Sequence, residues 1–202
     1  MSDLLDRVLN ALDHCEYEIG YGDMDEVCEI DHNLEYHSGA SRWCITHPEW
    51  DFVLKFGRFE EVSTDYCEIE AQNYKTAKAY GITAILLPIE EIYKTSAGVK
   101  IYKQEKFSYA MCEMNSKQYH AFAKRVDSLR NRRIVSKARN DCHDSYRISR
   151  EWFARAIQIY GKRFIRSFEA WTRECEVNDL HNGNIGFKNG RPIILDYAGF
   201  HG

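Results

Sequence analysis

The sequence predicts an α+β fold, with a β-rich first half and a helical second half that ends in a hairpin. Runs of β-branched and aromatic residues recur before residue 106, with one helical stretch among them. After residue 106 this pattern stops, and apolar residues recur at helical spacing. Hydrophobic residues make up 44% and aromatic residues 13% of the 202 positions, which suffices for a core and argues against a disordered chain.

Two periodicities locate the individual elements. Strands are expected where β-formers are bounded by turn residues, at 33–36, 42–46, 50–56, 85–89 and 99–102. Helices are expected where apolar residues recur every three or four positions, at 4–12, 65–80, 114–129 and 150–175. Gly81 is placed to end the second of these helices, and Ser149 is placed to begin the last. The acidic stretch 16–35 shows no clear period.

Acidic and basic residues are distributed unevenly, although the formal net charge is only -4. Between Met1 and Glu70, about eighteen carboxylates are opposed by four basic residues. The region 124–139 contains a dense basic group, formed by Arg130, Arg132, Arg133, Lys137 and Arg139. Such a group suits either a nucleic-acid partner or a solvated surface that balances the acidic half, and the second is the more common. Few aromatic residues interleave with the basic ones, so nucleic acid is the less favoured partner.

The cysteines and histidines follow no disulfide or metal pattern. Seven scattered cysteines include no CxxC pair, and none of the eight histidines falls into HExxH spacing. Reduced thiols in the cytoplasm are therefore expected, without a transition-metal site. The start of the chain lacks the basic and apolar regions of a signal peptide, and no apolar run is long enough to cross a bilayer. A soluble protein without a membrane partner is expected.

The last part of the chain predicts a β-hairpin. Two apolar runs, 185–187 and 193–195, flank a segment that contains Asn189-Gly190. Asn-Gly is the strongest short signal for a hairpin turn, because both residues tolerate the positive φ that the turn requires.

Polar residues bracket this hairpin. Asp179 and Asn184 precede its first strand, and Asp196 follows its second. A two-residue turn brings both ends of a hairpin to the same side, so we expect these three side chains to converge. Two carboxylates and an amide suit a divalent cation that also binds phosphate oxygens. The alternative is that Asp179 and Asn184 only cap or turn the chain.

The spacing of these residues resembles that of the protein-kinase-like superfamily. There, the catalytic loop carries an Asp, an Asn five residues later, and an Asp-Phe-Gly motif after a short hairpin. The run Asp179-Leu180-His181-Asn182-Gly183-Asn184 looks most like the aminoglycoside and choline kinase branch, because of His181 and Gly183. In size and motif form the chain is similar to compact kinase-like proteins of phages and bacteria.

The first half of the chain supplies the other residues that this resemblance requires. Lys55, at the end of a strand, matches the lysine that contacts the ATP phosphates, and Glu70 matches its partner glutamate, with Glu68 as the alternative. Ser38-Gly39-Ala40-Ser41 stands where the phosphate-covering loop belongs, although it has one glycine. Gln104-Glu105-Lys106 stands at the hinge that contacts adenine through backbone groups.

The resemblance implies an ATP- and Mg²⁺-dependent phosphotransferase whose substrate is an unidentified protein or small molecule. Asp179 is then the catalytic base, Asn184 and Asp196 are the magnesium ligands, and Lys55, held by Glu70, binds phosphates. The implied fold is bilobal: an N-terminal helical extension at 1–32, a β-rich N-lobe with one helix at 33–106, and a reduced helical C-lobe at 107–202 that ends in the hairpin.

Three departures from the kinase pattern leave the activity open. Val177-Asn178 replaces the His-Arg that normally precedes the catalytic Asp, and Asp196-Tyr197-Ala198 replaces Asp-Phe-Gly. The sequence continues for six residues after Asp196, which predicts that no substrate-binding subdomain follows the metal site. The alternatives are a pseudokinase-like nucleotide-binding or interaction protein without turnover and a nucleic-acid-associated protein that uses the region 124–139.

Overall fold

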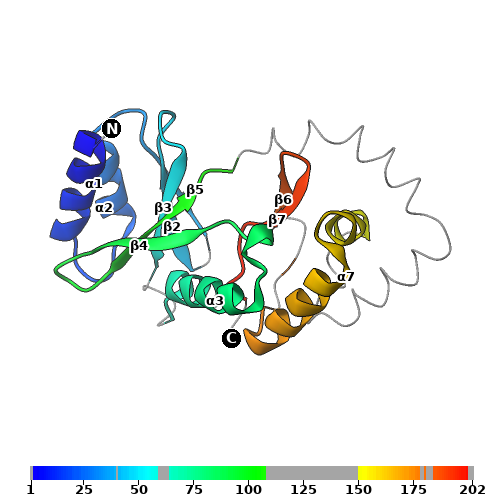
Figure 1. Ribbon diagram of the computed structural model, residues 1–202. Coiled ribbons are helices and arrows are strands. Elements are labelled where there is room, and N and C mark those ends of the chain that lie inside the picture. The colour runs from blue at the N-terminus through cyan, green and yellow to red at the C-terminus, as the bar shows by residue number, and fades with distance from the viewer. Residues whose placement is uncertain are drawn as a thin grey trace. The chain divides into compact units, whose positions relative to one another are not determined.

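The computed structural model describes residues 2–39, 41–58, 64–107, 150–177, 180 and 184–199 (Figure 1). Several expected features lie outside these residues: the helix at 114–129, the basic group within 124–139, and the residues Ala40, Ser149, Asp179, His181 and Gly183. The described part is α+β and divides into two compact units, residues 1–71 with 88–106 and residues 72–87 with 107–202. Residues 1–32 thus belong to the same unit as the strands that follow them.

The first unit contains a five-stranded antiparallel sheet with the strand order β1-β2-β3-β5-β4. Its strands are β1 (Glu35–Ser38), β2 (Arg42–Thr46), β3 (Phe52–Gly57), β4 (Ile89–Lys94) and β5 (Lys100–Glu105). β3 lies at the centre of the sheet, with Cys44 of β2 and Tyr102 of β5 opposite Lys55. Successive side chains of a strand point to opposite faces, so Lys55 lies on the face opposite to Leu54 and Phe56.

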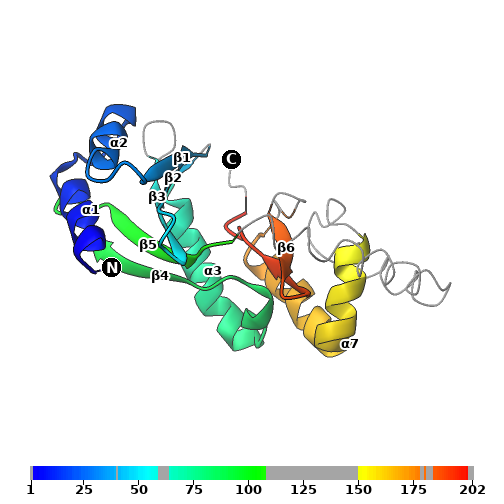
Figure 2. The same ribbon diagram turned by 90° about the horizontal axis from the view of Figure 1, so that it is seen from above.

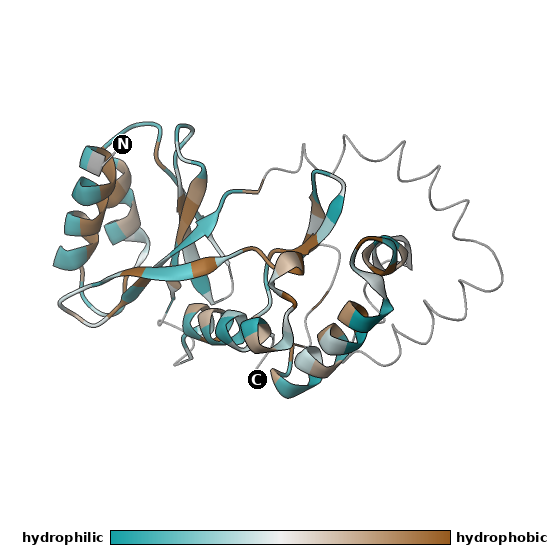
Figure 3. Ribbon diagram, viewed as in Figure 1, coloured by the Kyte–Doolittle hydropathy of each residue, from teal (hydrophilic) through white to brown (hydrophobic). Residues whose placement is uncertain are grey.

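Two helices, α1 (Ser2–His14) and α2 (Tyr21–Cys28), pack on the apolar face of this sheet (Figures 1 and 2). Figure 3 shows hydrophilic residues on the outer side of α1, as expected for the amphipathic pattern at 4–12. The shared core comprises Val8, Leu12, Met24, Val27, Trp43, Ile45, Leu54, Phe56 and Ile101, among others. α2 was not expected, because its two buried residues, Met24 and Val27, are too few to reveal a period.

Helix α3 (Tyr66–Tyr80) confirms the helix expected at 65–80. Asp65 caps its start, since the Asp65 Oδ1 atom accepts hydrogen bonds from the backbone N–H groups of Cys67 at 2.9 Å and Glu68 at 3.1 Å. Gly81 ends the helix with a φ of 68°, a left-handed conformation that glycine adopts without steric cost. The boundary between the two units falls within α3, after Ala71.

The strand expected at 85–89 is wrong. Residues Thr83–Ile85 form a 3₁₀ turn, and strand β4 begins only at Ile89 and extends to Lys94. Leu86 instead forms an isolated parallel bridge to Ile194, and the Leu87 N–H donates to the Ile194 oxygen at 3.1 Å. A short apolar run is compatible with several buried structures, so its period did not distinguish this packing from a strand.

The second unit is built from helix α7 (Arg150–Glu174) and the hairpin of β6 (Ile185–Lys188) and β7 (Arg191–Ile194). Asn189 and Gly190 both have positive φ, 51° and 73°, which confirms the expected Asn-Gly turn. The helix expected at 150–175 is present but interrupted at Gly161, whose φ of 82° and ψ of 166° are not helical. None of the helices described combines the length and the apolar character that a membrane span requires.

Candidate functional site

Lys55 forms a buried ion pair with Glu70. Lys55 comes from the central strand β3 and Glu70 from the second turn of α3, and the Nζ–Oε2 distance is 2.7 Å. The Glu70 side chain is 0% exposed and that of Lys55 is 7% exposed. Glu68, the alternative partner, pairs instead with Lys100 of β5. The lysine and the glutamate that the sequence singled out are therefore brought together.

Glu70 also binds two further side chains of the first unit. Arg42 of β2 donates from Nη1 to the same Oε2 atom at 2.9 Å. Gln104 of β5 donates from Nε2 to Glu70 Oε1 at 2.9 Å, and its own Oε1 accepts from Lys55 Nζ at 3.0 Å. These four side chains, the Glu70 cluster, come from three neighbouring strands and one helix.

Burial makes the members of the Glu70 cluster depend on one another. An ion in the protein interior costs several kcal/mol unless it is paired and hydrogen-bonded, and here each charge has such a partner. The result is an ammonium held in one place, which a lysine needs in order to present its charge to an anion. Arg42 was not among the residues expected at the site. The available signal was its place in the strand: Arg42 lies on the same face of β2 as Cys44, which is opposite Lys55.

The Cys67 thiol beside this cluster stays protonated. Cys67 is fully buried, and burial raises the pKa of its thiol far above the ordinary range, although the positive charges of Arg42 and Lys55 act in the other direction. A protonated thiol is a poor nucleophile and a poor metal ligand. Cys67 therefore contributes packing to the first unit and no evident chemistry.

Asn184 and Asp196 lie at the open end of the hairpin in the second unit. Ile185 pairs with Ile194, and the Leu195 N–H donates to the Asn184 oxygen at 2.8 Å, so the pairing continues to Asn184 and Leu195. Asp196 Oδ1 also accepts a hydrogen bond from the Ala198 N–H at 3.3 Å. This register places Asn184 opposite Leu195, one residue before Asp196. The convergence of the Asn184 and Asp196 side chains remains a prediction, and Asp179 lies outside the described residues.

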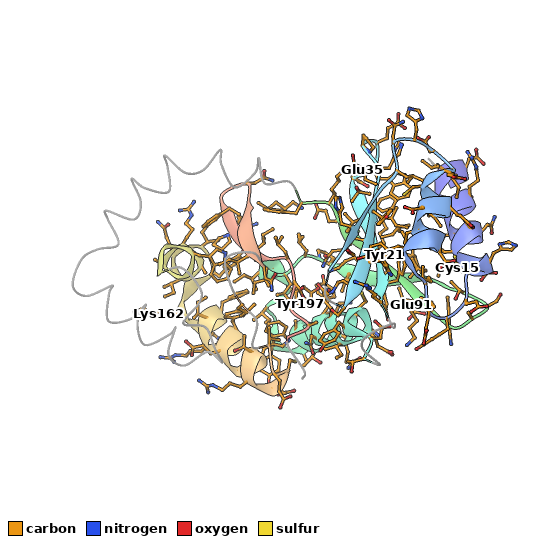
Figure 4. All side chains as sticks on the ribbon, turned by 180° about the vertical axis from the view of Figure 1, so that it is seen from behind. Cys15, Tyr21, Glu35, Glu91, Lys162 and Tyr197 are labelled. Atoms are coloured by element: carbon orange, nitrogen blue, oxygen red, sulfur yellow. The ribbon has the colours of Figure 1, made fainter. Side chains whose placement is uncertain are left out.

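Tyr197, which is labelled in Figure 4, directly follows Asp196. Its side chain is completely buried. Its hydroxyl donates to the Leu87 oxygen at 2.6 Å, and its backbone oxygen accepts from Asn73 Nδ2 at 2.9 Å. Asn73 was not among the expected site residues. The sequence feature that could have indicated Asn73 is a polar amide among the positions of α3 that face the protein interior.

The segment Ser38-Gly39-Ala40-Ser41 connects β1 to β2, as expected. The Gly39 N–H donates to the Arg42 oxygen at 2.9 Å, and the Ser38 hydroxyl is hydrogen-bonded to the Tyr21 hydroxyl at 3.2 Å. A Cβ atom added at Gly39 would meet the Arg42 oxygen at 3.7 Å, an ordinary contact. The described part of this loop therefore does not require glycine at position 39 on steric grounds.

The three residues expected at the hinge, Gln104-Glu105-Lys106, lie at the end of β5 and directly after it. Gln104 is part of the Glu70 cluster, and Glu105 pairs with Phe52 of β3. The Lys106 N–H donates to the Asp51 oxygen at 2.8 Å, and its ammonium donates to the His47 oxygen at 3.0 Å. The Lys106 N–H is thus used within the first unit.

No metal centre is evident among the residues that the structure describes. They contain no group of three or more His, Cys, Asp and Glu side chains placed to hold a metal ion. Asn184 and Asp196, the expected magnesium ligands, would offer one amide oxygen and one carboxylate, and the other ligands would have to come from phosphate or water. Comparisons of the chain with protein-family models, curated proteins and solved structures gave no match.

Proposed function

We propose that this chain is an ATP- and Mg²⁺-dependent phosphotransferase with a bilobal protein-kinase-like fold. The observation that carries the proposal is the buried ion pair between Lys55 and Glu70. In protein kinases, a lysine on the third strand contacts the ATP phosphates and pairs with a glutamate on the next helix. Here Lys55 lies on β3 and Glu70 on α3, the next helix along the chain. The first unit then corresponds to the N-lobe and the second to the C-lobe.

The remaining roles follow from phosphoryl-transfer chemistry, in which the protein mainly positions groups and neutralises charge. Lys55 binds the phosphates that are not transferred. Asn184 and Asp196 offer the amide and carboxylate oxygens that magnesium prefers, and the ion neutralises charge on the phosphates when bound. Asp179 accepts the proton of the attacking hydroxyl. The acceptor is a hydroxyl of a protein or small molecule, and we place the reaction in the cytoplasm.

A nucleotide-binding protein without turnover is the second candidate, favoured by the anchoring of Tyr197. In active protein kinases, the phenylalanine after the metal-binding Asp changes its packing between active and inactive states. The Tyr197 hydroxyl is hydrogen-bonded to the Leu87 oxygen at 2.6 Å, which opposes such a movement. A site held in this way suits a nucleotide that is bound and retained.

Purified protein incubated with radiolabelled ATP and magnesium separates these candidates. The measurements are phosphate transfer and the thermal shift caused by Mg·ATP, for the wild type and for Asp179→Ala, Asp196→Ala and Lys55→Met. Lys94→Met is the matched control, because Lys94 is an exposed lysine of the same sheet.

The phosphotransferase proposal expects transfer and a thermal shift for the wild type and the control. It expects loss of transfer with Asp179→Ala, and a weaker thermal shift with Lys55→Met. A nucleotide-dependent shift without transfer supports the second candidate. Background transfer and the absence of any shift, in the wild type as in the variants, would exclude both.

A further inference from the structure

Gln104 contacts both members of the Lys55–Glu70 pair. Its Oε1 accepts from Lys55 Nζ at 3.0 Å, and its Nε2 donates to Glu70 Oε1 at 2.9 Å. Lys55 Nζ donates to the other carboxylate oxygen of Glu70, Oε2, at 2.7 Å. The three side chains therefore form a closed ring of hydrogen bonds, in which Gln104 is 5% exposed.

The chemistry of the pair requires an amide in this place. An ammonium group can only donate and an ionised carboxylate can only accept, so the bridging side chain must accept on one side and donate on the other. The amide oxygen of Gln104 faces Lys55 and its NH₂ group faces Glu70, which satisfies both. Methionine has a similar length and provides neither a strong donor nor a strong acceptor.

The backbone of Gln104 is engaged in the sheet. Gln104 pairs with Val53 of β3 on one side and with Ile89 of β4 on the other. A residue inside an antiparallel sheet uses its N–H and C=O groups in the ladder. The backbone groups of Gln104 are therefore engaged in the sheet. Its side chain, in contrast, contacts Lys55, the lysine expected to bind phosphates.

We propose that Gln104 is a positioning residue, whose side-chain amide fixes the Lys55 ammonium in the place where it meets the phosphates of an anionic ligand. The four-carbon side chain of lysine has many rotamers, and a second hydrogen bond removes part of that freedom before the ligand binds. The positioning of Lys55 is independent of the ligand, whereas its use for phosphates rests on the proposed function.

The reactivity of Lys55 towards acetic anhydride measures this positioning without any nucleotide. The full chain is labelled under native conditions, and acetylation of Lys55 is quantified by mass spectrometry relative to the exposed Lys94. In Gln104→Met, Lys55 loses one hydrogen bond to an uncharged amide and Glu70 loses another, so the relative rate rises roughly tenfold. Lys103→Met, at the preceding residue and on the other face of β5, leaves the rate unchanged.

Gln104→Glu tests the same geometry within one protein. A protonated Glu at position 104 accepts from Lys55 and donates to Glu70 as the amide does, whereas an ionised one repels Glu70 and attracts the Lys55 ammonium. Two carboxyl groups that share a site raise one pKa above the usual value of about 4.3. The labelling rate of this variant, relative to wild type at each pH, is therefore expected to equal wild type at low pH and to fall below it as the pH rises, because the ionised carboxylate binds the Lys55 ammonium more strongly than the amide does.

The outcomes separate the inference from the proposed function. Unchanged Lys55 labelling in a folded Gln104→Met, or a labelling ratio of Gln104→Glu that is independent of pH, overturns the positioning role. If Gln104→Met does not fold, the pH dependence of Gln104→Glu decides alone. A second arm adds Mg·ATP or inorganic triphosphate: protection of Lys55 in the wild type supports the phosphate role. Absence of protection removes that role and leaves the labelling result for Gln104 intact.

Discussion

The Asn73 side chain donates a hydrogen bond from Nδ2 to the backbone oxygen of Tyr197 at 2.9 Å, across 124 positions of the sequence. Tyr197 follows Asp196 directly, so a residue of α3 holds the backbone next to the proposed magnesium ligand. Asn73 is 6% exposed, and Tyr197 is completely buried. This contact ties the end of the hairpin to the helix inside the second unit.

Replacing Asn73 by leucine is expected to destabilise the protein by about 1–3 kcal/mol, because a buried carbonyl oxygen loses its donor. Urea denaturation followed by circular dichroism measures the free energy of unfolding. Gln72→Ala is the matched control: the neighbouring side chain is exposed, and its loss is expected to change stability by less than about 0.5 kcal/mol. Equal values for the two variants would show that the Asn73–Tyr197 contact does not stabilise the protein.

The two members of the central ion pair are expected to differ in their effect on stability. Glu70→Ala removes the carboxylate that Lys55 and Arg42 share and is expected to cost about 3–5 kcal/mol, because buried cations lose their partner. In Lys55→Met the carboxylate keeps Arg42 and Gln104, so the expected cost is smaller, about 1–2 kcal/mol. Chemical denaturation of both variants measures the difference. A larger loss for Lys55→Met than for Glu70→Ala contradicts the shared carboxylate.

Gly161 is expected to tolerate no other residue without loss of stability. Its φ of 82° and ψ of 166° lie in a region that is almost restricted to glycine, so Gly161→Ala is expected to cost about 1–3 kcal/mol. Nothing lies within 4 Å of an added Cβ atom, so the cost comes from the backbone and not from a clash. The midpoint of thermal unfolding measures this effect.

Gly22, inside α2, is the matched control for Gly161. An added Cβ atom at Gly22 also meets nothing within 4 Å, and its φ is not in the left-handed region. Gly22→Ala is therefore expected to stabilise the protein, by about 0.5–1 kcal/mol, because alanine restricts the unfolded chain and favours the helix. Equal shifts of the two midpoints would argue against the backbone explanation.

The carboxyl group of Asp13 is expected to contribute a pH-dependent part of the stability. The backbone N–H of Ser96 donates to it at 2.6 Å and the Ser96 hydroxyl at 3.0 Å, and these bonds lower the pKa of Asp13 below its usual value. The unfolded chain then binds the proton more readily. The contribution is therefore present above the unfolded pKa of about 3.9 and is lost as the pH falls through the lower folded value.

Thermal unfolding of the wild type and of Asp13→Asn between about pH 2 and pH 7 tests this contribution. The asparagine variant keeps an oxygen acceptor and loses the titration, so its midpoint should fall less steeply as the pH decreases. The difference between the two proteins should be largest near neutral pH. Parallel curves would show that the bonds to Ser96 do not favour the ionised form.

Features that depend on neighbours along the chain could be predicted from the sequence. The leucine pattern of α1, the glycine that ends α3, and the turn at Asn189 and Gly190 all act over a few positions, and the structure has them where they were expected. The pairing of Lys55 with Glu70 was also expected, from the resemblance to the protein-kinase-like superfamily, with Glu68 as the alternative partner. The roles of these residues in phosphoryl transfer remain predictions.

Features that depend on distant partners required the tertiary structure. The run at 85–89 is apolar enough for a strand, but Leu86 and Leu87 meet Ile194 instead. The arrangement of the Glu70 cluster depends on Arg42, 28 positions before Glu70, and on Gln104, 49 positions after Lys55.

The amino-acid sequence by itself determined the α+β class, most of the elements and the residues that attract attention as a site. The tertiary structure decided which of them meet and which further side chains hold them. Local preferences are set by the chain within a turn or a strand, whereas a buried charge takes its partner from whatever segment packing brings beside it. For Lys55 that segment includes Gln104. The side chain of Gln104 connects this residue to the ion pair, whereas the sequence had indicated only a place at the expected hinge.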